Sequence, residues 1–362
     1  MITLMRSAKI LCFTTLLFFC GKVNAQYNSA KTDAWLEANA PEMGGRVVLM
    51  VWQNGKVVYS HAVNSMGMKQ KFAARMIARR QSKTADLENF TASTKIPFAS
   101  CSKWLSAALV MTFVDEGKLK LTDTVGKYLP MLSQHGKGNI TVSQCLSHLT
   151  GVKAPPTGEN IKEMREISSM DEAINDIANM KMEGKPGTVF HYSNVGLQIL
   201  GAILEKISGK SFEALFAERI AAPLNMKNTD FGKGKVAVPA GSARSTPEDY
   251  LNFTVMILNK GMFDNRRILS EKSVAEMQVN RRTPDVKTGY APEEAGDFGY
   301  AFGEWTMDSG VVSSPGLFGS FPWINNDKKY AAVMMTYYFK SIGRHDRYVE
   351  LKGIVDEAVE DK

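Results

Sequence analysis

The stretch Phe98-Ala99-Ser100-Cys101-Ser102-Lys103 decides the fold and the chemistry that this sequence predicts. It contains the only Ser-x-x-Lys in the chain and opens an apolar helical pattern from about Ser100 to Glu116. Residues three apart on a helix share a face, so the Ser100 hydroxyl is expected beside the Lys103 amine. A serine attacks once a neighbouring base takes its proton, and a lysine can be that base where its pKa is depressed. Taken alone, the tetrapeptide also fits a serine-capped helix with an incidental lysine.

A second motif, Tyr192-Ser193-Asn194, leads directly into a helical pattern that runs from Val195 to Ile207. At the start of a helix, Tyr-x-Asn presents a phenol and an amide to the same space. The phenol can carry a proton to a leaving group, and the amide can hold a substrate carbonyl. The same spelling at Tyr250-Leu251-Asn252 lies inside a helical pattern, so we expect those residues to pack.

Strand patterns occupy both ends of the chain, and helical patterns lie between them. Asn54-Gly55 joins two β-rich runs, at 46–52 and 56–63, which is a strong hairpin signal. Four more strand-like runs near the other end are followed by a closing amphipathic helix; the runs are 298–307, 311–314, 318–324 and 330–339. The segment 64–92 is polar and carries no assigned element.

These patterns predict an α/β (α+β) fold in which an antiparallel sheet is built from both chain ends and flanked by helices. A mostly helical lobe is inserted in the middle. We expect a single catalytic domain over 26–362, with a sheet lobe at about 26–116 and 246–362 and a helical lobe at about 117–245. The site is expected in the cleft between the lobes.

The chain resembles the serine β-lactamase and penicillin-binding-protein superfamily, most closely its class C β-lactamase-like branch of esterases, D-peptidases and related hydrolases. Beside the two motifs, the resemblance rests on stretches in the same order and spacing over about 45–340: 115–119, 128–130, 140–151, 192–204 and 245–249. It implies a β-lactamase/transpeptidase-like fold. It also implies that Ser100 is acylated, that Lys103 and Tyr192 move protons, and that Asn194 contacts the substrate.

The sequence departs from the family at its third motif, a Lys-x-Gly or His-x-Gly whose cation binds a substrate carboxylate. Lys287-Thr288-Gly289 spells that motif, but the prolines around it favour a loop. Ser314-Pro315-Gly316 comes just before the last strand pair, as the family motif does, and we favour it. Arg344 or Arg347 could supply a substitute cation, although charged surface is the favoured interpretation of both.

With Ser314-Pro315-Gly316 as the third motif, a hydroxyl replaces the family's cation. The N–H groups of Ser100 and Leu317 would still form an oxyanion hole. The predicted substrate-binding residues are therefore Asn194, Ser314, Gly316 and Leu317. Losing the cation argues against an efficient β-lactamase and against a peptidase that needs a free carboxylate.

The composition excludes several other classes of function. The formal net charge is only +7, and the one basic cluster, at 69–83, is interpreted as a solvated loop or helix face, so no nucleic-acid partner is expected. The histidines show no metal-ligand spacing, and no metal or organic cofactor is implied. His148 is interpreted as a structural hydrogen-bonding residue, whereas for His191 lining the cleft and packing beside it are equally open.

The first 25 residues are predicted to be a secretory signal peptide. Arg6 and Lys9 precede the apolar run 10–20, and Val23-Asn24-Ala25 offers small residues for cleavage. We expect a secreted or periplasmic product without a transmembrane segment; a lipoprotein attached through Cys20 is the less favoured alternative. Cys101 and Cys145 then remain, as one disulfide or as two buried thiols.

The sequence thus predicts a secreted serine hydrolase that works through an acyl-enzyme on an ester or amide, as a carboxylesterase or a peptidase-like enzyme. Its partner would be a small-molecule or peptide substrate, and its oligomeric state is open. Two alternatives stay open: a β-lactamase or D,D-peptidase acting on β-lactams or peptidoglycan stem peptides, and a catalytically silent binding protein with the same fold.

Overall fold

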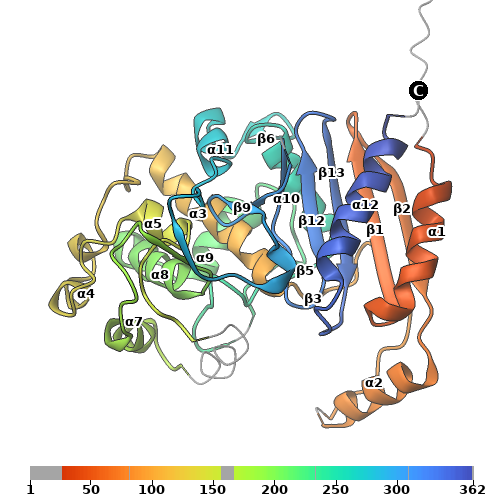
Figure 1. Ribbon diagram of the computed structural model, residues 1–362, viewed down its shortest axis with the longest axis horizontal. Coiled ribbons are helices and arrows are strands. Elements are labelled where there is room, and N and C mark those ends of the chain that lie inside the picture. The colour runs from red at the N-terminus through yellow and green to blue at the C-terminus, as the bar shows by residue number, and fades with distance from the viewer. Residues whose placement is uncertain (1–26, 81, 156–166, 233, 309, 361–362) are drawn as a thin grey trace, which may run out of the picture.

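The computed structural model describes residues 27–80, 82–155, 167–232, 234–308 and 310–360 of the 362-residue chain (Figure 1). The predicted signal peptide and its cleavage site lie outside the described residues. Within those residues, no helix is both long enough and apolar enough to cross a bilayer.

The centre of the fold is a seven-stranded antiparallel sheet in the order β2-β1-β13-β12-β11-β10-β9. Its N-terminal strands are β1 (Arg46–Gln53) and β2 (Lys56–Asn64). They meet at Asn54-Gly55, where both residues have positive φ (52° and 84°), as the tightest hairpin turns require. The other strands are β9 (Gly299–Tyr300), β10 (Trp305–Thr306), β11 (Val311–Ser313), β12 (Phe321–Asn325) and β13 (Tyr330–Thr336).

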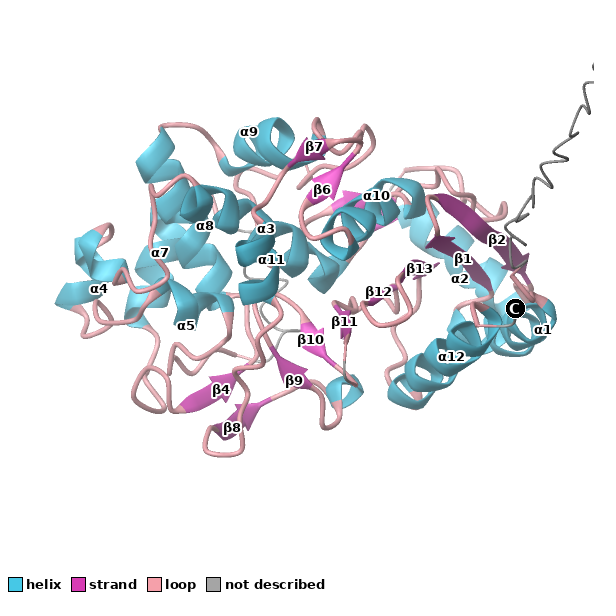
Figure 2. Ribbon diagram, turned by 90° about the horizontal axis from the view of Figure 1, so that it is seen from above, coloured by secondary structure: helices cyan, strands magenta, loops and turns pink. Residues whose placement is uncertain are grey.

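Strand β1 pairs with β13, so the sheet is assembled from both ends of the chain, as the sequence predicts. Alternate residues of β1 point to opposite faces. Val47, Leu49 and Val51 pack with α1 (Ala30–Asn39) and α12 (Arg344–Ala358), whereas Val48 and Met50 join the main core. Figure 2 shows α1 and α12 on one side of the sheet and α10 (Pro247–Leu258) on the other.

Helices and loops form the other part of the molecule, at the left of Figure 1. Helix α3 (Ser102–Asp115) is buried from Ser102 to Phe113 and packs against α8 (Val195–Ser208). The other α-helices that the structure describes here are α4 (Pro130–Gln134), α5 (Val142–Leu146), α7 (Met170–Asn179), α9 (Phe212–Phe216) and α11 (Glu271–Met277).

Three short strand pairs complete the fold. They are β3 (Ile96–Pro97) with β5 (Arg244–Ser245), β4 (Val189–His191) with β8 (Lys287–Tyr290), and β6 (Met262–Phe263) with β7 (Arg266–Arg267). The first pair leads into the 3₁₀ turn η2 (Ala99–Cys101), just before α3, and the second leads into Tyr192.

One helix outside the main body has no counterpart among the predicted elements. The unassigned segment 64–92 contains the helix α2 (Met68–Arg80), which has no buried residue. The helix gave no amphipathic signal toward a core because none of its side chains is buried in one. The expected strand at 298–307 is divided into β9 and β10 by a turn at 301–304.

Candidate active site

Ser100 and Lys103 lie together at the start of the central helix. Ser100 belongs to η2, and Lys103 is in the first turn of α3. The Lys103 Nζ lies 3.1 Å from Ser100 Oγ and 3.1 Å from Asn194 Oδ1, and it donates to the Ala240 carbonyl at 2.9 Å. Three of the predicted site residues are therefore brought together around one nitrogen.

The surroundings of Lys103 favour its neutral form. Its side chain is only 1% exposed, and burial lowers its pKa from 10.5 to about 7. The amine contacts a hydroxyl, an amide oxygen and a main-chain carbonyl, and no carboxylate is within ion-pair distance among the described residues. Lys103 can therefore accept a proton near neutral pH.

Tyr192 closes the other side of this group. Its phenol hydrogen-bonds with Ser100, and its ring faces the amine, with Lys103 Nζ 4.7 Å from the ring centroid. Burial raises the pKa of Tyr192, with a smaller opposing effect of the hydrogen bond to Ser100, so the phenol keeps its proton at neutral pH. A protonated phenol beside the serine can donate to a leaving group.

His148 supports Tyr192 from behind. Its ring is buried 4.6 Å from the Tyr192 ring, between centroids. Its Nε2 lies 2.9 Å from the Tyr300 hydroxyl, and its Nδ1 accepts the Ser193 N–H at 3.4 Å. Burial, aided by Lys103, holds the pKa of His148 well below its usual value. These contacts confirm the predicted structural hydrogen-bonding role.

His191 does not line the active-site cavity. It is buried, with Nδ1 against Glu183 Oε1 and Nε2 3.0 Å from the Ala154 carbonyl. Of its two open interpretations, the structure supports packing beside the site. The Tyr250-Leu251-Asn252 sequence also packs as predicted: Tyr250 is buried in α10, and its hydroxyl donates to the Cys101 carbonyl at 2.7 Å.

The stretch Ser314-Pro315-Gly316 lies beside Ser100. A Cβ on Gly316 would stand 2.3 Å from the Phe98 carbonyl oxygen, so only glycine allows this approach. The Ser314 hydroxyl donates to the Gly303 carbonyl at 2.9 Å and reaches the Ser100 carbonyl at 3.4 Å. It is therefore directed to the main chain, and Ser314 is not among the residues that line the cavity.

The two N–H groups expected to form an oxyanion hole are both compatible with that role. Leu317 lines the cavity, and its N–H has no acceptor among the described residues. Ser100 is the second residue of η2, where N–H groups have no partner within the helix.

Lys287-Thr288-Gly289 does not line the cavity that holds Ser100. The expectation of a loop was wrong, because these residues form most of β8, which pairs in parallel with β4. The flanking prolines are tolerated because β8 is a short strand with a single partner. Lys287 is exposed and lies outside the cavity lining, so it does not supply a cation beside Ser100.

A cavity of about 520 Å³ opens at Ser100 and Tyr192. Aromatic and apolar side chains supply most of its wall, together with two carboxylates; the residues beyond Ser100 and Tyr192 are Tyr290, Ala291, Pro292, Glu293, Glu294, Trp305, Pro315, Leu317, Phe339 and Ser341. None of these described lining residues is a lysine, arginine or histidine. The loop that carries Glu293 and Glu294 gave no interpretable sequence signal.

The expectation of Arg344 as charged surface was wrong. Its side chain is fully buried behind the cavity wall, where Nη1 pairs with Glu294 Oε1 at 3.2 Å and Nη2 donates to the Tyr338 and Lys340 carbonyls. A buried guanidinium needs such partners to offset its lost hydration. Arg344 therefore fixes the Glu294 loop and is not presented to a substrate.

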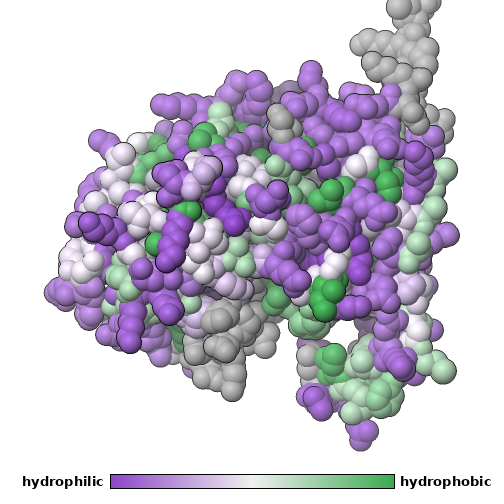
Figure 3. All heavy atoms as spheres, viewed as in Figure 1, coloured by the Kyte–Doolittle hydropathy of each residue, from purple (hydrophilic) through white to green (hydrophobic). Residues whose placement is uncertain are grey.

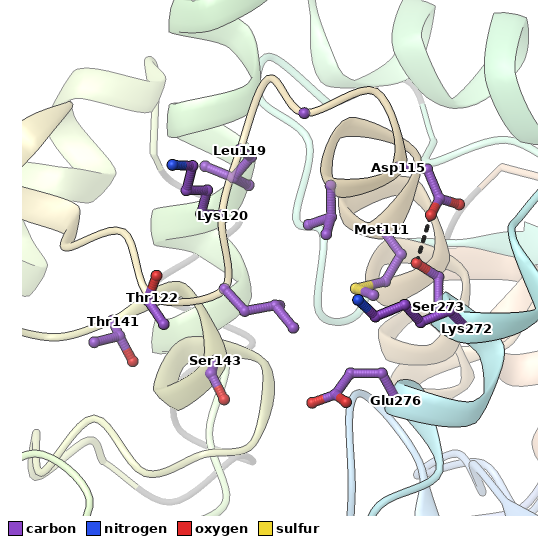
Figure 4. Close-up of a pocket in the computed structure, with 13 residues that line it drawn as sticks. Met111, Asp115, Leu119, Lys120, Thr122, Thr141, Ser143, Lys272, Ser273 and Glu276 are labelled. Atoms are coloured by element: carbon purple, nitrogen blue, oxygen red, sulfur yellow. Dashed lines mark hydrogen bonds between the residues drawn. The ribbon is translucent and has the colours of Figure 1, made fainter.

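A larger cavity, of about 740 Å³, lies at the far end of α3 (Figure 4). None of the predicted site residues lines it. Its carboxylate Asp115 accepts a hydrogen bond from the Ser273 hydroxyl at 2.7 Å, a bond that ties α3 to α11. Of the two cavities, only the smaller one is lined by predicted catalytic residues, Ser100 and Tyr192.

The two remaining sequence questions concern cysteines and metals. Cys101 and Cys145 are free, buried thiols, so the alternative of a disulfide between them is wrong. Among the residues that the structure describes, no group of His, Cys, Asp or Glu has the arrangement of a metal site.

Comparisons with known proteins agree with this geometry. A protein-family model described as Beta-lactamase matches residues 38–353. The structure superimposes with a TM-score of 0.74 on a putative beta-lactamase from Bacteroides dorei DSM 17855, which is 27% identical, over 92% of this chain and 99% of that one. EstCE1, a hydrolase with promiscuous acyltransferase activity, shares the fold at 19% identity, with a TM-score of 0.69 over 91% of this chain and 98% of its own.

A curated relative matches a shorter part of the chain. The protein flp of Staphylococcus aureus (strain MW2) is 27% identical over 146 residues, which are 38% of this chain and 28% of flp. The chain therefore aligns with less than a third of that relative's length.

Proposed function

Because the chain belongs to the beta-lactamase family of serine hydrolases, we propose that it hydrolyses an ester or amide through an acyl-enzyme on Ser100. One observation carries the proposal: a buried lysine with a pKa near 7 lies 3.1 Å from the serine oxygen. A binding protein has no need for a serine held beside a base of this kind.

The chemistry follows from the positions of the four groups. Neutral Lys103 takes the proton of Ser100 as its Oγ attacks the substrate carbonyl carbon. The N–H groups of Ser100 and Leu317 stabilise the oxyanion. Tyr192 gives a proton to the leaving oxygen or nitrogen as its bond to carbon breaks. Water then attacks the acyl-enzyme and gives a proton to Tyr192. The bond from the acyl carbon to Ser100 Oγ breaks, and Lys103 returns the proton to Ser100.

Asn194 has two uses in this scheme. Its Oδ1 holds the Lys103 amine in line with Ser100 at 3.1 Å, and its side-chain amide is the group that the proposal assigns to the substrate carbonyl. Asn194 is only 6% exposed and is not among the residues that line the cavity, so a substrate carbonyl would have to come close to Lys103 to meet its amide.

The wall of the cavity supports an ester or amide substrate without a free carboxylate. Glu293 and Glu294 line the cavity, and Arg344, behind its wall, is already paired with Glu294. An anionic substrate would meet carboxylates where a penicillin-recognising enzyme offers a cation, and like charges at close range repel. EstCE1, which has the same fold, is a hydrolase with acyltransferase activity, in line with acyl transfer as the proposed reaction.

Intact-protein mass spectrometry tests the proposal. The protein and its Ser100→Ala variant are incubated with a fluorophosphonate, p-nitrophenyl acetate and butyrate, a penicillin and a cephalosporin. We expect a phosphonate adduct and ester turnover, both absent from the variant, without β-lactam acylation. An adduct with a β-lactam would favour a penicillin-recognising enzyme instead. The absence of any Ser100 adduct would leave a silent binding protein.

The predicted leader belongs to the same proposal. We propose that the enzyme acts outside the cytoplasm, as a product that begins at Gln26. The mass of the protein recovered from an expressing cell tests this: a lipidated mass with Cys20 as first residue would point to the lipoprotein alternative, and an uncut chain would contradict export.

A further inference from the structure

Helix α2 projects from the body with its apolar side chains in solvent (Figures 1 and 3). Met68, Phe72 and Met76 are 90%, 65% and 38% exposed. They are spaced four residues apart, so they form one continuous stripe along the helix. Three large apolar side chains in one exposed row mark an interaction surface, because single exposed apolar residues are ordinary but contiguous ones are not.

The opposite face of α2 anchors the helix to the body. Gln70, Ala74 and Ala78 are half-buried, and they start two residues after the stripe, which places them about 200° around the helix. The Gln70 side chain donates to the Pro41 carbonyl at 2.7 Å and accepts the Gly67 N–H at 2.7 Å. The body therefore fixes which face of α2 points outward.

Cations accompany the apolar stripe. Lys71, Arg75 and Arg79 form a parallel row beside it, Lys69 lies on its other side, and Arg80 ends it. The helix contains no acidic residue, and none of its five cations has an acidic partner in the part of the chain that the structure describes. The face thus combines unpaired positive charge with exposed apolar area.

We propose that α2 binds the surface of an anionic phospholipid bilayer, lying in its plane with Met68, Phe72 and Met76 among the acyl chains. Basic rows beside an apolar stripe match the headgroup region and the hydrocarbon boundary at once, because long cationic side chains reach out to phosphates while their stems stay apolar. A second copy of the chain fits less well, since pairing this face with itself would bring five cations against five. This inference is independent of the proposed function.

Vesicle binding tests the inference. The protein is mixed with vesicles of phosphatidylcholine alone or with phosphatidylglycerol, at low and high salt, and the bound fraction is measured by co-sedimentation. Two removed cations should lower the partition coefficient onto anionic vesicles about thirtyfold, so Arg75→Gln/Arg79→Gln is the charge variant. Met68→Ser/Phe72→Ser/Met76→Ser removes the apolar stripe and should lower it by at least as much. All variants have the same N-terminus. Any binding of vesicles by the apolar run 10–20 is therefore the same in every variant and does not affect their comparison.

Matched controls come from exposed residues outside α2. Val57→Ser/Val279→Ser and Arg266→Gln change similar side chains and should bind as the unaltered protein does. Hydrogen–deuterium exchange locates the contact: residues 68–80 should be protected by anionic vesicles only, and high salt should remove the protection. The inference would be overturned if the α2 variants bound anionic vesicles as well as the unaltered protein does. It would also be overturned if bound vesicles did not protect residues 68–80 from hydrogen exchange. A concentration-dependent dimer that Phe72→Ser abolishes without lipid would likewise overturn it.

Discussion

The Nζ atom of Lys103 lies 3.1 Å from the Oγ atom of Ser100, and both side chains are buried. Burial disfavours the charged form of the lysine, and only the neutral amine can accept the serine proton. Activity should therefore depend on the ionisation of this one amine, which gives the site a characteristic response to pH.

The first prediction is a pH profile governed by Lys103. Because its pKa is lowered to about 7, kcat/KM for p-nitrophenyl butyrate should rise about tenfold per pH unit below pH 7 and level off above it. A stopped-flow or plate-reader profile from pH 5 to 9 measures this. A profile that is flat through pH 7, at constant protein stability, would contradict Lys103 as the base.

The second prediction separates the roles of Tyr192 and Lys103. Tyr192→Phe removes the proton donor and should lower kcat/KM roughly 10²–10⁴-fold for an alkyl ester, whose leaving group needs a proton during acylation. For a p-nitrophenyl ester the loss should be much smaller, because p-nitrophenolate leaves unprotonated. Steady-state rates on both esters provide the measurement, and equal losses on the two would point to a structural role for Tyr192.

The third prediction concerns the main-chain N–H of Leu317. Leu317→Pro deletes that donor and should lower kcat roughly 10²–10³-fold. Leu317→Ala keeps the N–H and changes only the side chain, so it should retain most of the activity and serves as the matched control. Thermal unfolding of both variants checks that the fold is intact; a Leu317→Ala variant as inactive as Leu317→Pro would remove the oxyanion role.

The fourth prediction concerns Glu304, a fully buried carboxyl at the end of the turn between β9 and β10. Neither of its oxygens has a partner in the described part of the chain, and burial raises its pKa well above the usual value. The unfolded chain releases this proton first, so the wild-type protein loses stability as the pH rises from the unfolded-state pKa toward the folded-state pKa.

Glu304→Gln should therefore be the more stable protein at pH 8 and nearly equal to wild type at pH 4. Between the two pKa values, the difference in the free energy of unfolding should widen by about 1.4 kcal/mol per pH unit. Urea denaturation at several pH values measures it. A difference that does not change with pH would show that Glu304 is ionised in the fold.

The fifth prediction tests the charge of the cavity wall. A succinate half-ester should be hydrolysed more slowly than a butyrate ester of the same alcohol, because its carboxylate approaches Glu293 and Glu294. Glu293→Gln should narrow the ratio of the two hydrolysis rates a few-fold, a magnitude typical of an exposed charge. Glu37→Gln, an exposed acid on α1, should leave the ratio unchanged; an unaltered ratio in Glu293→Gln would show that Glu293 does not face the substrate.

The site residues whose placement depends on local spacing could be predicted from the sequence. Ser100 and Lys103 are one helical turn apart, and the Tyr192 motif precedes a helix whose apolar pattern is unmistakable, so resemblance and periodicity agreed. The antiparallel sheet followed from the Asn54-Gly55 hairpin and from strand patterns at both ends. Each of these patterns is local to one short segment, although the strands that they predict come from both ends of the chain.

The parts that escaped prediction depend on contacts between distant segments. Arg344 finds its charged partner, Glu294, about fifty residues away in the chain, and nothing in the sequence around Arg344 indicates that partner. The same is true of Glu293 and Glu294, which a loop without regular pattern brings to the cavity. Helix α2 was not predicted for a different reason. None of its residues is buried, so its apolar residues do not show the periodicity of a helix that packs against a core.

The pairing of β1 with β13 also has a consequence for how the chain is made. The first hairpin to be synthesised must wait for the last strands before its open edge is covered, and such distant pairing slows folding. Closure then brings the two described ends together, with Lys31 Nζ 2.6 Å from Glu357 Oε2. A short peptide joining those ends, with new ends opened in an exposed loop, would make β13 and β1 near neighbours in sequence while leaving every contact of the sheet in place.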